Sequence, residues 1–207
     1  MPTLDYLRTA CSRDLRDPNK RTFTDPYLTD LINSGQEEVS RVYPREMIAS
    51  GPIVSGTTSY LLDITQAFRV EVWRSGQFHS VVPSGEDADN SQAGYDIWSG
   101  ALRFPKALIA SLNPATDTFS VWGYASYPQL YDPTDESYLD DSGEWGVRRF
   151  VRSQAFQQMH ADRSQFKQWQ GQAQNSDVTP NMLSQMVAFY TSEWDRTRNH
   201  LRRLRRQ

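Results

Sequence analysis

The sequence has few of the residues on which metal and catalytic sites depend. It contains one cysteine and three histidines among 207 residues. A single cysteine, Cys11, excludes an internal disulfide and any zinc site built from cysteine pairs. The histidines, His79, His160 and His200, are far apart in the chain, and none belongs to a metal-binding or nucleophile motif. We therefore expect no metal, no cofactor and no catalytic residues, which means a protein that is not an enzyme.

Long apolar runs are missing as well. No stretch approaches the roughly 18 apolar residues that cross a bilayer, and the first residues include acids where a signal peptide would be apolar. Hydrophobic residues make up only 38% of the chain, but six Trp, ten Tyr and nine Phe provide more aromatic surface than a disordered chain would have. We expect a soluble protein with no membrane contact, made inside a cell, that buries part of its surface only on assembly.

Helical periodicity is present at both ends of the chain. A first helix is predicted from apolar residues at intervals of three and four, namely Leu4, Leu7, Cys11 and Leu15. A second helix is predicted to begin at Asp25-Pro26, because Asp is a good N-cap and Pro fits the first helical position. Gly35 lies in the apolar stripe of that helix, which indicates close packing against another helix. Thr179-Pro180 repeats the cap signature and predicts a long final helix.

The middle of the chain has the pattern of short strands and turns. Between residues 53 and 127 the segments are short and rich in β-branched and aromatic residues. Ser75-Gly76 and Ser99-Gly100 predict two-residue hairpin turns. One expected strand has two unlike faces, Phe68, Val70 and Val72 against Arg69, Glu71 and Trp73. The β region also contains three tryptophans, which we expect in core or interface packing; a face that binds sugar or a single nucleic-acid strand is the alternative.

These patterns together predict an α+β fold. We expect a helical bundle, made of N-terminal helices plus two long C-terminal helices, with an inserted antiparallel β domain. Residues 1–50 would be the N-terminal helical part of the bundle, and residues 51–130 the inserted β domain. Residues 131–144 would be an acidic loop, and residues 145–207 the C-terminal helices that complete the bundle and carry a basic end.

Charge is unevenly distributed along the chain. The net charge is −3, and residues 196–207 hold six arginines and no acid, so the remainder carries −3 minus +6, or −9. Leu201 and Leu204 continue the apolar stripe of Leu183, Val187, Tyr190 and Trp194. The arginines are therefore predicted to lie on the polar sides of a helix, where a cationic C-terminal end is also favoured by the helix dipole.

The acidic run before the C-terminal helices allows several interpretations. It consists of Asp132, Asp135, Glu136, Asp140, Asp141 and Glu144. A solvated loop is the simplest, and pairing with a basic surface of a neighbouring subunit is the second. A catalytic carboxylate pair would need two carboxyl groups held at a set distance, and a cluster of acids in a loop does not specify one.

One segment resembles a known family. Residues Phe23 to Asn33, FTDPYLTDLIN, followed by Glu37-Glu38-Val39 and Tyr43-Pro44, resemble the opening of the head-to-tail connector or adaptor proteins of tailed bacteriophages, also called neck or head-completion proteins. In that family this helix belongs to a small helical bundle, and strands inserted after it form a β domain. The order of elements expected here is similar along most of the chain.

The resemblance implies a structural protein of the virion neck, assembled in the host cytoplasm and without a cofactor. It implies a homo-oligomeric ring, most often of twelve subunits, below the portal protein and joined to the tail or to the next neck protein. Genomic DNA would pass through the bore during ejection without sequence-specific binding. Portal contact in the family is commonly made by C-terminal segments.

Two sets of residues are candidate sites under this hypothesis. The portal-docking set is Arg196, Arg198, Leu201, Arg202, Arg203, Leu204, Arg205 and Arg206. The inter-subunit acidic patch is Asp132, Asp135, Glu136, Asp140, Asp141 and Glu144. We expect removal of residues 201–207 to leave a folded protein that no longer joins the head. The alternatives are a nucleic-acid-binding protein that uses the arginine-rich helix, and an enzyme acting on polysaccharide.

Overall fold

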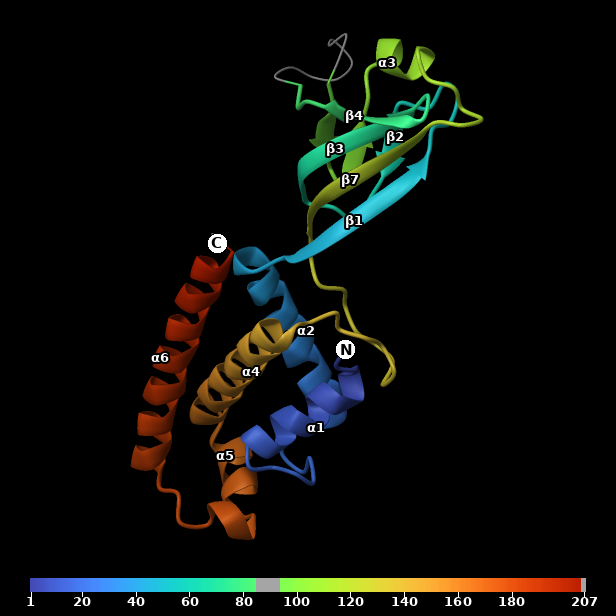
Figure 1. Ribbon diagram of the computed structural model, residues 1–207. Helices are drawn as coiled ribbons and strands as arrows, with labels where there is room; N and C mark the ends of the chain where they lie inside the picture. The colour runs from blue at the N-terminus through green and yellow to red at the C-terminus, as the bar shows by residue number, and fades with distance from the viewer. Residues whose placement is uncertain (85–93, 206–207) are drawn as a thin grey trace. The chain divides into compact units, whose positions relative to one another are not determined.

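The computed structural model of the protein describes residues 1–84 and 94–205 (Figure 1). The chain divides into two compact units. The helical unit comprises Met1–Pro44 and Tyr127–Gln207, and the β unit comprises Arg45–Ser126. Both ends of the chain therefore belong to the same unit. The described residues form six α-helices and two antiparallel sheets, so the predicted α+β class is confirmed.

Helix α4 is the centre of the helical unit. The helices of this unit are α1 (Leu4–Asp14), α2 (Asp25–Val42), α4 (Asp141–Ala161), α5 (Arg163–Gln170) and α6 (Pro180–Leu204), with a 3₁₀ turn at Ala173–Asn175. Helix α4 contacts α1, α2, α5 and α6, and it lies between α2 and α6 (Figure 1). It consequently buries residues on more than one side, among them Val147, Val151, Ala155, Phe156 and Met159.

Two glycines allow the neighbouring helices to approach α4 closely. A Cβ atom at Gly35 of α2 would lie 3.1 Å from Phe150 Cδ1 and 3.2 Å from Val147 Cγ1 of α4. A Cβ atom at Gly146 of α4 would lie 2.9 Å from Leu201 Cδ1 of α6. The close packing predicted for Gly35 is therefore confirmed, and its partner is α4.

The helix ends follow the sequence signals with one difference. Thr179 caps α6 as predicted, because its side chain accepts a hydrogen bond from the backbone N–H of Met182. The N-cap of α2 is Thr24, whereas the sequence indicated Asp25, which is the first residue of the helix. Asp162 ends α4 and caps α5 by accepting from the backbone N–H groups of Ser164 and Gln165, so the helical pattern after residue 145 is divided in two.

The β unit consists of two small sheets. One has the order β1-β7-β3-β4, formed by β1 (Arg45–Pro52), β7 (Thr118–Ala125), β3 (Gln66–Arg74) and β4 (Gln77–Val81). The other has the order β2-β6-β5, formed by β2 (Ser59–Leu61), β6 (Ala101–Arg103) and β5 (Asp96–Trp98). The short helix α3 (Lys106–Ala110) follows β6. Apolar residues of both sheets and α3 form one core, which includes Val70, Val72, Leu102, Ile109, Phe119 and Val121.

Both predicted hairpin turns are confirmed. Ser75 and Gly76 have φ values of 52° and 82°, and they connect β3 to β4 with Arg74 opposite Gln77. Ser99 and Gly100 have φ values of 50° and 77° between β5 and β6. Positive φ at both central residues is the type I′ geometry, whose twist matches that of the flanking strands.

The structure corrects three details of the predicted β region. Strand β1 was not predicted, because REMIASGP has weak strand propensity; it forms by pairing along its whole length with β7. Helix α3 was not predicted either. Phe68 was expected on the buried face with Val70 and Val72, but it is 54% exposed. A register shift between Ala67 and Arg69 forms a bulge there, which turns Phe68 to the other face.

The packing of the helical unit predicts a pH effect on stability. Cys11 is buried in α1, and this burial raises the pKa of its thiol to about 12. The unfolded chain loses that proton at a lower pH, near the ordinary value of 9.0, so stability is full below pH 9 and falls as the pH rises towards 12. We expect the free energy of unfolding to drop by about 1.4 kcal/mol at pH 10. Urea titrations at pH 8 and pH 10 measure it.

The control for this prediction is Cys11→Ala. That variant lacks the thiol and should lose less stability between pH 8 and pH 10 than the parent chain, although its stability at pH 8 is lower because of the cavity. An equal loss in both proteins would show that the Cys11 thiol is not the group responsible.

Candidate functional site

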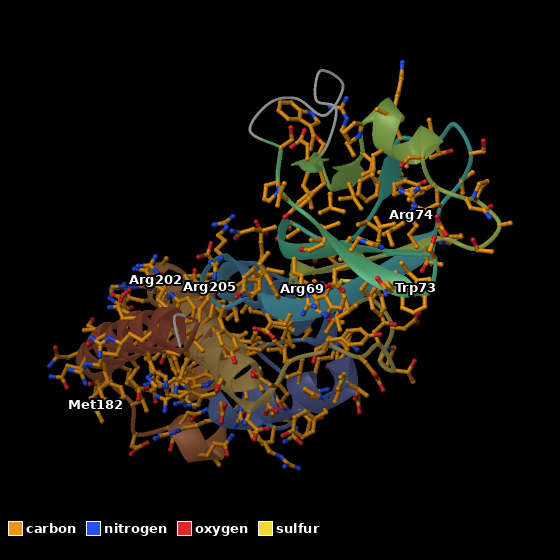
Figure 2. The ribbon with its side chains drawn as sticks, turned by 45° about the horizontal axis from the view of Figure 1, so that its top comes forward. Arg69, Trp73, Arg74, Met182, Arg202 and Arg205 are labelled. Atoms are coloured by element: carbon orange, nitrogen blue, oxygen red, sulfur yellow. The ribbon has the colours of Figure 1, made fainter. Side chains whose placement is uncertain are left out.

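The arginine-rich end of the chain is helical up to Leu204, as predicted. Helix α6 continues through residues 196–204, and its apolar side remains in the core of the helical unit. Leu201 is 0% exposed, and Leu204 packs against the same core. The arginines accordingly lie on the remaining sides of the helix, and Figure 2 shows Arg202 and Arg205 near its end. Arg206 lies outside the described residues.

The arginines of this end differ in their partners. Arg198 forms an ion pair with Asp195 at 3.3 Å. Arg196, Arg202 and Arg203 are exposed, and none has an ion-pair partner among the residues that the structure describes. The surface available for docking therefore consists mainly of these three guanidinium groups, whereas Leu201 serves the core.

The acidic run is not a free loop. Its backbone is held to the N-terminal residues by hydrogen bonds from Leu4 N to Asp135 O, from Asp5 N to Pro133 O and from Ser137 N to Pro2 O, each 3.0 Å long. Helix α4 begins at Asp141, inside the range 131–144 expected to be a loop. Residues 131–140 are therefore a loop with exposed acids, as the simplest interpretation expected, but the loop is anchored to the N-terminal residues and ends at residue 140 rather than at residue 144.

Three of the six acidic side chains form hydrogen bonds or ion pairs within the chain. Asp135 accepts hydrogen bonds from the backbone N–H groups of Tyr131 and Asp132, and these bonds lower the pKa of its carboxyl group. Asp140 is the N-cap of α4, and it also accepts from the Tyr43 hydroxyl at 2.7 Å. Glu144 belongs to the ion-pair network described below. Exposed acids with no polar side-chain partner in residues 1–84 and 94–205 are Asp132, Glu136 and Asp141.

The start of α4 and the arginine-rich end of α6 lie side by side at one end of the helical unit, whereas Asp132, Asp135 and Glu136 belong to the segment bonded to residues 2–5. Helices α4 and α6 are antiparallel neighbours, so the start of α4 lies beside the end of α6 (Figure 1). The rings of Trp145 and His200 are 6.3 Å apart and perpendicular, and Gly146 is in contact with Leu201. Trp145 is also 41% exposed. This end therefore combines exposed arginines, the exposed carboxylate of Asp141 and an exposed aromatic ring.

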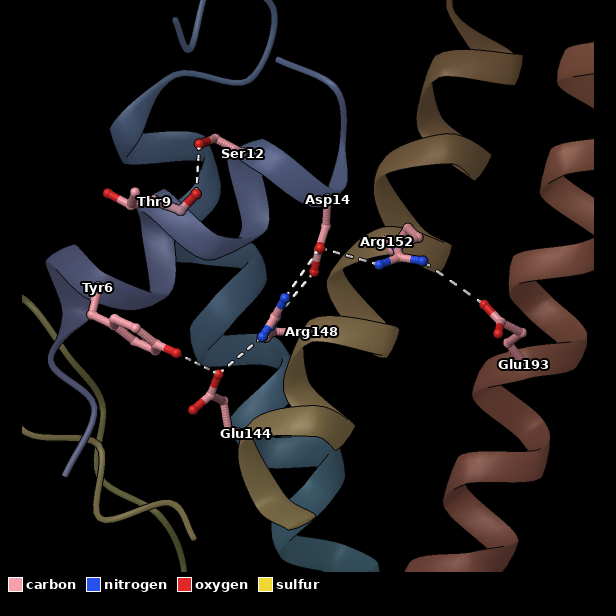
Figure 3. Close-up of polar contacts among 8 residues, drawn as sticks. All are labelled: Tyr6, Thr9, Ser12, Asp14, Glu144, Arg148, Arg152 and Glu193. Atoms are coloured by element: carbon pink, nitrogen blue, oxygen red, sulfur yellow. Dashed lines mark hydrogen bonds and ion pairs between the residues drawn. The ribbon is translucent and has the colours of Figure 1, made fainter. Parts of the chain in front are cut away.

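A network of ion pairs joins α1, α4 and α6 beside this end (Figure 3). Arg148 of α4 donates to Asp14 of α1 at 2.9 and 3.1 Å, and to Glu144 at 3.1 Å. Arg152 reaches Asp14 at 3.3 Å and Glu193 of α6 at 3.9 Å. Asp14 thus lies between two arginines of α4, so the pairs fix how α1 and α6 are placed around α4.

Two further contacts extend the network. Tyr6 donates its hydroxyl to Glu144 at 3.1 Å, and the charge of Glu144 raises the pKa of Tyr6. Arg149 pairs with Glu193 and also lies over the ring of Trp145, 5.2 Å from its centroid. Hydrogen bonds to Asp14 raise the pKa of Arg148, which keeps this guanidinium charged. The arrangement is structural, since every carboxylate in it is matched by a guanidinium or a hydroxyl.

The sequence interpretation did not identify this network. The spacing Glu144, Arg148, Arg152 places three charges on one side of a helix, which is a recognisable signal. Their partners Asp14 and Glu193 could not be found from spacing, because they lie far away in the chain. Glu144, expected in an inter-subunit patch, is mostly committed to this network.

The tryptophans of the β unit lie outside its core. Trp73 is half-buried, with its ring 4.6 Å from that of Phe78. Trp122 is half-buried under the guanidinium of Arg69, 4.8 Å from the ring centroid. Trp98 is 68% exposed. The expected core packing is therefore wrong for these three residues, while interface packing stays a prediction.

The three histidines of the chain lie apart in the structure. Within the part of the chain that the structure describes, no cluster of three or more His, Cys, Asp or Glu side chains could hold a metal ion. His160 is hydrogen-bonded to Ser184 Oγ at 3.0 Å, His200 contacts Trp145, and His79 is exposed on β4. None of the helices in residues 1–84 and 94–205 is long and apolar enough to cross a bilayer.

No family model matches this chain, and no curated protein is significantly similar to it.

The ion-pair network predicts a measurable coupling between α1 and α4. We expect a double-mutant cycle with Asp14→Asn and Arg148→Met to give a coupling free energy of about 1 kcal/mol, because both side chains are largely shielded from water and share two hydrogen bonds. Chemical unfolding of the four proteins measures it.

A matched control is the pair Glu37 and Arg41 on α2. These side chains are about 60% exposed, at 59% and 61%, so their coupling should stay below about 0.5 kcal/mol. A coupling at Asp14 and Arg148 no larger than at the control pair would contradict the structural role of the network.

Proposed function

We propose that the protein is a structural virion protein, a head-to-tail adaptor that forms a ring below the portal and connects capsid to tail. In this proposal α1, α2, α4 and α6 are the bundle of the connector family, and the β unit is the inserted domain. The genome passes through the bore without sequence-specific contacts. The protein carries no catalytic residue or cofactor.

The observation that carries the proposal is the discontinuous helical unit. Residues 1–44 and 127–207 form one unit, and residues 45–126 form a second unit inserted between them. This is the order of elements that the resemblance of the Phe23–Asn33 segment implies. That segment forms the start of α2, which packs on α4 at Gly35.

The charged end of the helical unit supplies the docking surface in this proposal. Arg196, Arg202 and Arg203 face outward from a helix whose position is fixed by the core. A rigid set of cations suits an acidic surface of the portal or of a neighbouring copy. Exposed acids at the same end, such as Asp141, would pair with basic residues of the neighbour, and such pairs set register and encounter rate more than affinity.

Nucleic-acid binding is the second candidate function, and the three unpaired arginines favour it. Phosphate contacts by these side chains would give an affinity that falls steeply with salt. Opposing this, the exposed acids at the same end of the unit would repel phosphate. A chain that binds duplex DNA strongly at low salt, but stays monomeric with and without a portal protein, would establish this alternative over the adaptor.

Particle sizing tests the adaptor proposal. We expect native mass spectrometry of the full chain, alone at rising concentration or mixed with the portal protein of the same phage, to give a closed oligomer of one defined subunit number. Heterologous contacts that close must give such a single number. A monomer under all of these conditions would contradict the proposal.

The docking surface is tested by charge reversal, because truncation is not a clean experiment. Removing residues 201–207 would delete Leu201, which is fully buried against Gly146, so this truncation does not separate a lost docking surface from a disturbed core. We expect Arg202→Glu with Arg203→Glu to lower the unfolding temperature only slightly, because two acids in the last turn of α6 oppose the helix dipole, and to weaken portal binding at least about tenfold. The matched control is Arg163→Glu with Lys167→Glu, two exposed cations of α5, which should bind normally.

A further inference from the structure

Among residues 1–84 and 94–205, strand β4 is an edge strand of the four-stranded sheet. It pairs with β3 on one side, and it is the last strand in the order β1-β7-β3-β4. Gln77, Phe78, His79 and Ser80 are all exposed, and Phe78 is 58% exposed. Exposed edges are usually protected by charged residues, proline or a bulge. The sequence of β4, QFHSV, has no lysine, arginine, acid or proline.

The backbone groups that point outward from this edge can be identified. In an antiparallel pair, alternate residues direct N–H and C=O away from the partner strand. The carbonyl of Val82, just beyond β4, accepts from Tyr95 N at 3.0 Å, so Val82 faces outward. Counting back by two, Ser80 and Phe78 face outward as well. Their groups have no backbone partner among the described residues, whereas the same side of the chain is already paired at Val82 and Ser84.

A pocket lies next to this edge, on the core side of the sheet. Its volume is about 500 Å³, which is large enough to hold one or two side chains of a bound segment. Val72, Val81, Leu108 and Leu112 supply its apolar surface. A strand added beside β4 would direct every second side chain into this space, because side chains alternate between the faces of a sheet.

One charged residue lies at the wall of this pocket. Arg74, at the end of β3, lines it together with Gln77 and His79. Arg74 is exposed and forms no ion pair or hydrogen bond with any residue in the described part of the chain. It leaves β3 on the opposite side from Trp73, as Figure 2 shows. If a bound segment placed an apolar side chain in the pocket, a carboxylate of the same segment could therefore form an ion pair with Arg74.

We propose that β4 and this pocket form a docking site for an extended segment of a partner protein. The segment pairs with the outward backbone groups of Phe78 and Ser80, places an apolar side chain in the pocket and pairs a carboxylate two residues away with Arg74. This is recognition by strand addition, in which main-chain hydrogen bonds give affinity and side-chain pockets give specificity. The inference does not depend on the proposed adaptor function.

Segments of the chain itself fit this site less well. Residues 85–93, GEDADNSQA, offer acids but no apolar side chain larger than alanine. The acidic segment around Asp135 is already bonded to the N-terminal residues. Strand β1 of a second copy would present an edge whose Met47 and Ala49 side chains already pack against its own core. A partner segment that is not already part of a sheet can pair with the backbone groups of the β4 edge and also place an apolar side chain in the pocket.

Labelled pentapeptides test the proposal by fluorescence polarisation with the full chain. The probes are Ac-Thr-Leu-Thr-Glu-Thr-NH₂ and its versions with Lys or Gln in place of Glu, or with Ser in place of Leu. We expect the Leu/Glu peptide to bind best, with about a fivefold preference for Glu over Lys, typical of an exposed ion pair. Arg74→Glu should reverse that preference, and Lys106→Glu, an exposed cation of α3 that does not line this pocket, should leave it unchanged.

A second variant tests the edge itself. Ser80→Pro removes an outward N–H without removing a bond to β3, a position where edge strands tolerate proline. The variant should unfold at the same temperature as the parent chain. Its affinity for the Leu/Glu peptide should be at least about tenfold lower.

Several results would overturn the proposal. These are no binding of any peptide, equal binding of the Glu and Lys peptides, or binding unaffected by Ser80→Pro. Binding that appears only after deletion of residues 85–93 would identify that segment as the occupant. A dimer that Ser80→Pro dissociates would identify a second copy.

Discussion

The structure of the helical unit depends on the packing of α4 against its neighbours. Glycines on α2 and α4 bring the helices close enough for Phe150, Val147 and Leu201 to interlock. Asp14 then joins Arg148 and Arg152, which fixes α1 against the same helix. Because α6 is held by this core up to Leu204, the arginines at its end occupy defined positions.

The fixed position of α6 beside α4 determines which charged side chains are free to contact a partner. In the sequence, the acidic run ends at Glu144 and the arginine-rich end begins 52 positions later at Arg196, which suggests two distant patches. In the structure the start of α4 lies beside the arginine-rich end of α6, and three of the acids serve as a cap, a backbone acceptor and an ion-pair partner. Fewer side chains are therefore free for docking than the sequence suggests; within residues 1–84 and 94–205, those of the two candidate sets without a partner are Asp132, Glu136, Asp141, Arg196, Arg202 and Arg203.

Local signals in the sequence identified much of the fold, while signals that depend on partners were missed. Thr179-Pro180, Ser75-Gly76 and Ser99-Gly100 specify their conformations by short-range chemistry, and the structure confirms all three. Strand β1 was missed because only its pairing with β7 makes it a strand. Phe68 was placed on the wrong face because a bulge cannot be read from alternation, and Asp14 and Glu193 were missed because their arginines are distant in sequence.

We propose that this chain is a subunit of a symmetric ring between head and tail. The most direct test is electron microscopy of phage particles that carry this protein, with a tag at the N-terminus to locate the chain. We predict a closed ring of this chain at the portal vertex, with the helical unit toward the portal. Particles that lack the chain, or that hold it away from that vertex, would contradict it.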